Sequence, residues 1–303
     1  MQQVKKARKS RVRRMKVSAL NIAIQDRDLQ KAASYRDLFI ALAGLNEAVR
    51  YQGESRLLLS GVWEDENDDH RMLGVLDRFT DLDAFQWYNR DARRLATPEE
   101  RATITVPAAM RANYRAFYVL LDLRKHKLVF LSYEASTSLS AKQVAFVFRH
   151  LLENPHIFER FGSVGVSIMQ EPAALDRILN APNLRYLSIE VNKPNGSFGG
   201  LDEDFEDQME ALQAKRLKYE VVADDRGSIQ PDETIRKAAA VALSDGVVEG
   251  RIFENGITEP ISTQQYPVSE TITYSPDNEP QLSAFKRAAS IILGRLAKVL
   301  KRQ

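Results

Sequence analysis

Apolar residues recur along this chain at two alternating spacings, and these spacings predict its secondary structure. From residue 116 onward, runs with the two-residue period of a strand alternate with runs spaced like one face of a helix. The expected strands cover 116–123, 127–133, 163–169, 184–191, 217–222 and 247–253, and the expected helices cover 140–152, 172–179, 202–214 and 231–243. This order is typical of a sheet covered by helices on at least one face. We therefore expect an α/β fold with a mixed sheet, and a mixed α+β fold is the alternative.

The pattern outside this central part is less regular. We expect strands over 16–25 and 268–274, a helix over 35–49, and a hairpin with strands over 56–63 and 72–79. In the connection that follows, Thr97 and Pro98 predict the start of a short helix. The chain then divides into an arm (1–15), an N-terminal α/β region (16–110), a main α/β region (111–280) and a basic amphipathic C-terminal helix (281–303). The two α/β regions are either separate or parts of one domain.

The distribution of charge changes this picture most. The formal net charge is only +2, but residues 1–16 carry eight cations and residues 281–303 carry six, with no acid in either segment. The chain between them holds 29 basic and 41 acidic residues, so basic ends flank an acidic body. Such polarity can direct the ends to a polyanion, and it can equally fold them onto an acidic neighbour or onto the body.

The N-terminal arm is the main candidate for binding nucleic acid, DNA or RNA. It is polar and lacks apolar periodicity, so we expect residues 1–15 to be disordered. Clustered cations bind phosphates without sequence preference through counterion release. The candidate contacts are Lys5, Lys6, Arg8, Lys9, Arg11, Arg13 and Arg14. A solubilising tail without a selected partner is the alternative.

Composition excludes several kinds of site and indicates a compartment. The chain has no cysteine, which excludes disulfides, thiolate nucleophiles and cysteine-ligated metals. No signal peptide is readable, and no stretch reaches the roughly 18 apolar residues of a membrane span. We expect a cytoplasmic protein with no membrane span.

Several segments resemble a known group of proteins. They are residues 104–107 (Ile-Thr-Val-Pro), 113–117 (Asn-Tyr-Arg-Ala-Phe), 126–130 (His-Lys-Leu-Val-Phe), 184–195 and 246–256. Over about residues 16–275, the chain resembles a family of uncharacterised bacterial proteins that share a domain of unknown function. The resemblance implies a bacterial cytosolic protein of a kind found near mobile elements and phage-defence genes. It supplies no functional residues to carry over.

Individual side chains suggest further chemistry, each with a plainer interpretation. His126 lies in the predicted turn at 124–126, where we expect it to be exposed. Arg149 and His156 have the spacing of a helical ribonuclease motif, but Asn154-Pro155 is expected to end the helix between them. The acidic segment 64–70 lacks the glycine and glutamate of a calcium loop, so we expect a solvated turn.

Two alternatives to nucleic-acid binding remain. Glu134, Glu190 and Lys193 lie on or beside predicted strands and are candidates for a metal-dependent nuclease site. That alternative requires Mg²⁺, whereas no cofactor is predicted otherwise. The C-terminal helix over 281–303 suggests a non-catalytic subunit that contacts a partner protein or a second copy of the chain. The first hypothesis is a nucleic-acid-binding protein of an anti-phage or mobile-element system, and whether the protein is an enzyme is left open.

Overall fold

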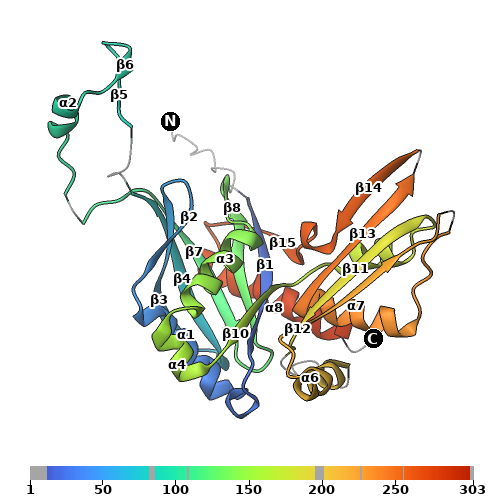
Figure 1. Cartoon of the computed structure of the whole chain (residues 1–303). Coiled ribbons are helices and arrows are strands. Elements are labelled where there is room, and N and C mark those ends of the chain that lie inside the picture. Colours follow the sequence, from blue (N-terminus) through green and yellow to red (C-terminus); the bar gives the residue numbers. More distant parts are fainter. Residues whose placement is uncertain are drawn as a thin grey trace, which may run out of the picture.

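The computed structural model describes residues 12–81, 86–107, 109–194, 201–225, 227–254 and 256–300. The described strands form two principal sheets, each with its own hydrophobic core and its own helices (Figure 1). Every pair of described strands runs antiparallel, so the structure shows the mixed α+β form of the expected fold. Among the described helices, none is long and apolar enough to cross a membrane.

The first sheet is built around β1 (Arg13–Ile24), which pairs with three other strands. Its strand order is β10-β1-β8-β7-β4-β3-β2, with β15 added to β1 and β9 added to β8. The other strands are β2 (Ala48–Gln52), β3 (Ser55–Asp65), β4 (Asp68–Thr80), β7 (Ala112–Asp122), β8 (Lys127–Glu134), β9 (Thr137–Ser138), β10 (Val164–Ile168) and β15 (Ser269–Tyr274). The predicted hairpin at 116–133 is present as β7 and β8.

Helices cover both faces of the first sheet. α1 (Ala32–Gly44), α3 (Ala141–Leu152) and α4 (Pro155–Phe161) lie on one face, and α8 (Gln281–Leu300) lies on the other (Figure 1). Since α3 contacts both β2 and β10, which lie at opposite ends of the strand order, the sheet curls around this helix. α8 packs on β1, β15, β7 and β8, so the chain's own sheet covers its apolar face.

The second sheet has the order β12-β11-β13-β14. Its strands are β11 (Leu184–Asn192), β12 (Arg216–Val222), β13 (Gly246–Glu254) and β14 (Ile257–Ser262). α5 (Pro172–Leu179), α6 (Leu201–Ala211) and α7 (Glu233–Asp245) accompany this sheet. A Cβ at Gly246 would lie 1.8 Å from the carbonyl oxygen of Glu190, so only glycine fits where α7 passes into β13.

A long excursion leaves the first sheet between β4 and β7. It contains a small hairpin of β5 (Tyr88–Asn89) and β6 (Arg94–Leu95) and the short helix α2 (Pro98–Ala102), and it projects away from the body (Figure 1). Thr97 caps α2 in a capping box with Glu100, which confirms the predicted helix start.

Several boundaries differ from those predicted. β1 begins at Arg13, so residues 13–15 of the expected disordered arm belong to the sheet, while residues 1–11 lie outside the described residues. The helix expected over 35–49 ends at Gly44, because Asn46 has a positive φ of 48° and residues 48–52 pair with β3 instead. The regions 16–110 and 111–280 share one sheet through the pairing of β4 with β7, and the second sheet is inserted between β10 and β15.

Candidate functional site

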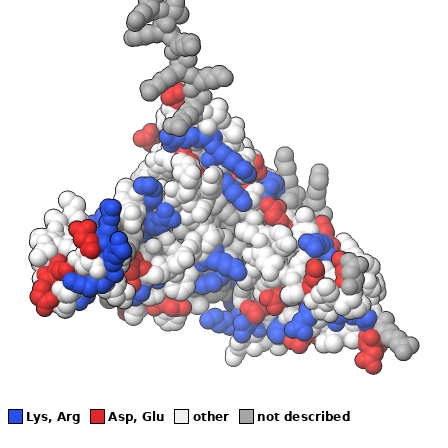
Figure 2. Space-filling view, turned by 90° about the horizontal axis from the view of Figure 1, so that it is seen from above, with Lys and Arg blue, Asp and Glu red and all other residues white. Residues whose placement is uncertain are grey.

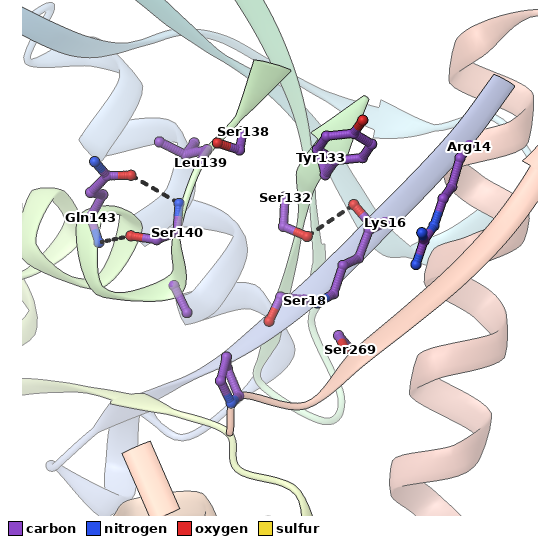
Figure 3. Close-up of a pocket in the computed structure, with 12 residues that line it drawn as sticks. Arg14, Lys16, Ser18, Ser132, Tyr133, Ser138, Leu139, Ser140, Gln143 and Ser269 are labelled. Atoms are coloured by element: carbon purple, nitrogen blue, oxygen red, sulfur yellow. Dashed lines mark hydrogen bonds between the residues drawn. The ribbon is translucent and has the colours of Figure 1, made fainter. Parts of the chain in front are cut away.

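A cleft of about 620 Å³ opens on the first sheet where β1 runs between β8 and β15. We call it the serine-rich cleft. Its lining residues are Arg14, Lys16, Ser18, Ser132, Tyr133, Ser138, Leu139, Ser140, Ala141, Gln143, Pro267 and Ser269 (Figure 3). Among the described residues, the lining contains two cations and five serines, and none of these residues is acidic.

The alternation of β1 places the two cations on the cleft side of the sheet. Met15 and Val17 are fully buried in the core that includes α8. Since neighbouring strand residues face opposite sides, Arg14, Lys16 and Ser18 lie on the other face. Arg14 is exposed and Lys16 is half-buried, and neither lies within 4.0 Å of a carboxylate in the described part of the chain. The cleft therefore holds two cations that no described carboxylate neutralises.

A β-bulge in β8 shapes the middle of the cleft. At the bulge the register shifts by one residue. Lys16 faces Tyr133 and Val17 faces Leu131, which leaves Ser132 as the extra residue of β8. The Ser132 hydroxyl donates to the Lys16 carbonyl oxygen at 3.0 Å, and the Ser18 hydroxyl donates to the Val268 carbonyl oxygen at 2.6 Å. These hydroxyls hold three strands together at the floor of the cleft.

The N-terminus of α3 forms one wall. Ser140 accepts from the Gln143 backbone N–H at 3.2 Å, and the Gln143 side chain accepts from the Ser140 backbone N–H at 2.9 Å (Figure 3). Ser140 therefore caps α3 in a capping box with Gln143. The positive end of the helix dipole adds to the potential of Arg14 and Lys16.

Glu134 lies on β8 close to these residues but outside the cleft lining. Its buried carboxylate accepts from the Tyr274 hydroxyl and from the Gln281 amide, and Arg13 lies 3.8 Å away. Burial, followed by the hydrogen bond to Glu134, raises the pKa of Tyr274 to about 12. Glu134 therefore joins β8, β15 and the start of α8.

The sequence-predicted site residues fall into separate places. Of the candidate arm contacts, Arg13 and Arg14 lie in β1, whereas Lys5, Lys6, Arg8, Lys9 and Arg11 lie outside the described residues. Seen from above, Lys and Arg side chains form several separate patches, with uncharged residues and Asp and Glu side chains between them (Figure 2).

Glu190 and Lys193 lie at the end of β11 in the second sheet, away from Glu134. Arg216 pairs with Glu190 at 3.1 Å, and Lys193 lies 4.0 Å from Glu210. No group of three or more histidine, aspartate or glutamate residues in the described ranges is arranged to hold a metal ion. The three residues considered for a nuclease therefore do not form one site.

The expectation of an exposed His126 is wrong. Its ring is 7% exposed and stacks on Tyr35 of α1 at 3.8 Å, because the left-handed turn (φ 57°) directs it back into the sheet. Burial, together with the neighbouring Lys127 charge, lowers the pKa of His126 to about 3.

The plainer interpretation of Arg149 and His156 holds, whereas the acidic segment 64–70 is solvated only in part, because Asp65 is 4% exposed. α3 ends at Leu152 and α4 begins at Pro155, so Arg149 and His156 lie on different helices. The Arg149 guanidinium donates two hydrogen bonds to the Val166 carbonyl oxygen, and its burial lowers its pKa.

Sequence reasoning missed the serines and the bulge. Arg14, Lys16 and Ser18 have a visible two-residue spacing, which is the signal that places them on one face of a strand. Ser132, Ser138 and Ser269 join them only through pairings of β1 with β8 and β15, and such pairings cannot be seen in the sequence of one strand.

Comparison with known proteins identifies one family. Residues 13–290 match the model of a family described as Domain of unknown function (DUF4747). No curated protein matches the chain. The match begins with β1 and ends within α8, so it covers both sheets.

Proposed function

The chain belongs to this family of unknown function, and we propose that it binds nucleic acid through the serine-rich cleft and the basic residues that precede it. The observation that carries the proposal is the pair of unneutralised cations, Arg14 and Lys16, in a cleft without acidic residues. Residues two apart on a strand are about 7 Å apart, so both can contact one phosphate backbone. The resemblance adds a setting to this proposal, a bacterial cytoplasm and an anti-phage or mobile-element system.

The uncharged groups of the cleft also suit a phosphate backbone. Serine hydroxyls and helix N-termini are common phosphate contacts in nucleic-acid complexes. Tyr133, whose side chain is exposed at the rim, offers a ring on which an unpaired base can stack. The cations at 5–11 directly precede β1 in the sequence.

The proposal assigns binding and no chemical step to this cleft. Its lining contains no aspartate, glutamate or histidine that could move a proton or hold a metal. Tyr274 and Gln281 donate hydrogen bonds to the Glu134 carboxylate, so we do not propose Mg²⁺-dependent cleavage at this residue.

The test compares two double variants of the full-length protein. Arg14→Ala/Lys16→Ala removes the cleft cations, and Arg124→Ala/Lys125→Ala removes two cations from the turn at the other end of the same sheet. Affinities for fluorescent single- and double-stranded DNA and RNA are measured at several salt concentrations. We expect the cleft variant to bind at least tenfold more weakly, with a salt slope lower by about 2, since each lost phosphate contact removes about 1.

The control variant should keep the wild-type affinity and slope. Deletion of residues 1–11 from the cleft variant should weaken nucleic-acid binding further. A cleft variant that retains the wild-type slope would overturn the role of the cleft, and absence of binding in low salt would overturn nucleic-acid binding altogether.

A further inference from the structure

A second cleft, of about 500 Å³, lies between the two sheets. We call it the inter-sheet cleft. β10, the end of β1, α3 and α4 line one side, and β11 and the start of β13 line the other. Cavities of this size hold small organic ligands, and polar groups among apolar walls fix the orientation of such ligands.

Two lysines face each other at this cleft. Asn192 pairs with Arg216 across β11 and β12, and the next backbone contact joins the Lys193 N–H to the Lys215 carbonyl oxygen at 3.3 Å. Lys193 and Lys215 are therefore cross-strand neighbours, and like charges in this position repel. Lys215 has no ion pair among the described residues, and Lys193 reaches Glu210 only at 4.0 Å. Glu153 and Glu190 also line the cleft, and Glu190 pairs with Arg216 instead of with either lysine. An anionic ligand would relieve the repulsion.

Asp245, at the end of α7, also lines the inter-sheet cleft. The residue is 1% exposed, and one carboxylate oxygen accepts from the Asn21 amide. The other oxygen, Oδ2, has no hydrogen-bond partner among the described residues. A buried acceptor without a partner is destabilising, and an N–H group of a ligand would supply the missing hydrogen bond. Burial raises the pKa of this carboxyl above its ordinary value, although the Lys127 charge and the Asn21 hydrogen bond act in the opposite direction.

An exposed aromatic ring borders the same cleft. Phe158 of α4 is 60% exposed although it lines the cavity. Leu152, Val166 and Val247 supply apolar walls around it. A planar heterocycle that stacked on Phe158 would cover this ring.

We propose that the inter-sheet cleft binds a nucleoside phosphate. The phosphate lies between Lys193 and Lys215, the base stacks on Phe158, and an N–H group of the base donates to Asp245. This inference does not rest on nucleic-acid binding at the serine-rich cleft, because the two clefts share no lining residue.

Isothermal titration calorimetry on the full-length protein tests the proposal. The probes are GMP, AMP, CMP and UMP, with ribose 5-phosphate and inorganic phosphate as fragments. We expect at least one nucleotide to bind at least tenfold more tightly than ribose 5-phosphate. Lys193→Ala/Lys215→Ala should weaken that nucleotide at least tenfold, and Phe158→Ala and Asp245→Asn should each weaken it severalfold.

Three controls make the result specific. Lys31→Ala/Lys237→Ala removes two lysines that do not line the cleft, and Arg14→Ala/Lys16→Ala alters the other cleft, so both should bind the nucleotide within twofold of wild type. Far-ultraviolet circular dichroism confirms folding of each variant. The proposal is overturned if no nucleotide binds below 1 mM, if ribose 5-phosphate binds as tightly as the nucleotides, or if the Lys193/Lys215 variant keeps wild-type affinity.

Discussion

His126 is buried in the structure, although its sequence position predicts an exposed side chain. The sequence predicts the turn that holds it, because two β-rich runs flank a short polar segment. Its burial depends on Tyr35, which α1 supplies from a distant part of the chain. The ring therefore stays neutral inside the fold at pH values where an exposed histidine gains a proton.

This burial makes stability depend on pH. The folded pKa of about 3 lies below the ordinary value of 6.5, so below pH 6.5 the unfolded chain binds a proton that the folded chain does not. His126 thus contributes full stability above pH 6.5 and loses it as pH falls, by up to about 1.4 kcal/mol per pH unit. Asparagine suits the left-handed turn. When the pH is lowered from 7.5 to 5, we expect the free energy of unfolding of His126→Asn to fall by about 2 kcal/mol less than that of wild type. Urea unfolding at both pH values measures this difference. Equal losses in the two proteins would contradict the assignment.

At the scale of elements, α8 is the helix that the sequence predicts best. Its apolar stripe gives both its position and its buried face, and Phe285, Ala289 and Ile292 are fully buried as the stripe implies. What the stripe cannot give is the partner of its basic face. Lys286 reaches Asp65, the last residue of β3. Burial alone would raise the pKa of Asp65, but the hydrogen bonds from Lys286 and the Asn67 backbone lower it below its ordinary value.

Removal of the Lys286 charge should therefore lower the free energy of unfolding more than removal of an exposed charge does. Lys286→Met leaves Asp65, whose side chain is 1% exposed, without its cation, and we expect a loss of about 2–4 kcal/mol in the free energy of unfolding. Arg287→Met, which breaks the exposed pair with Glu279, should cost at most about 1 kcal/mol. The double variant Asp65→Asn/Lys286→Met should recover most of the loss. Equal costs for Lys286→Met and Arg287→Met in urea unfolding would argue against this interpretation.

At the scale of the whole molecule, sequence patterns predict most strands and helices, because each is encoded by the period of its own residues. They do not predict that these strands separate into two sheets, since this depends on pairings between distant segments such as β1 with β15. The junction of the sheets depends on polar side chains with no periodic signal. Gln170 donates to the carbonyl oxygens of Ile168, Ala242 and Gly246 at 3.0, 3.3 and 2.7 Å.

Gln170 consequently connects the edge of the first sheet with α7 and β13. We expect Gln170→Leu to lower the free energy of unfolding by about 1–3 kcal/mol, because buried carbonyl groups lose their donor. Hydrogen exchange should quicken around 164–170 and 242–248, the two sides of the junction, while β3 and β4 remain protected. Gln208→Leu, an exposed change on α6, is the control. Uniform exchange changes across both sheets would contradict a local role at the junction.

The pairing of β1 with β15 also bears on how the protein is made. Ser18 and Val268, which share a hydrogen bond, are 250 positions apart in the chain. A ribosome adds about 5–20 residues per second, so β1 emerges roughly 10–50 seconds before the strand that completes its pairing. During this interval the backbone of β1 can pair only with β8 and β10, and the face that α8 covers stays open. Chaperones that recognise nascent chains therefore have time to bind it. A message truncated before codon 269 would yield a protein in which the central strand of the first sheet keeps one open edge.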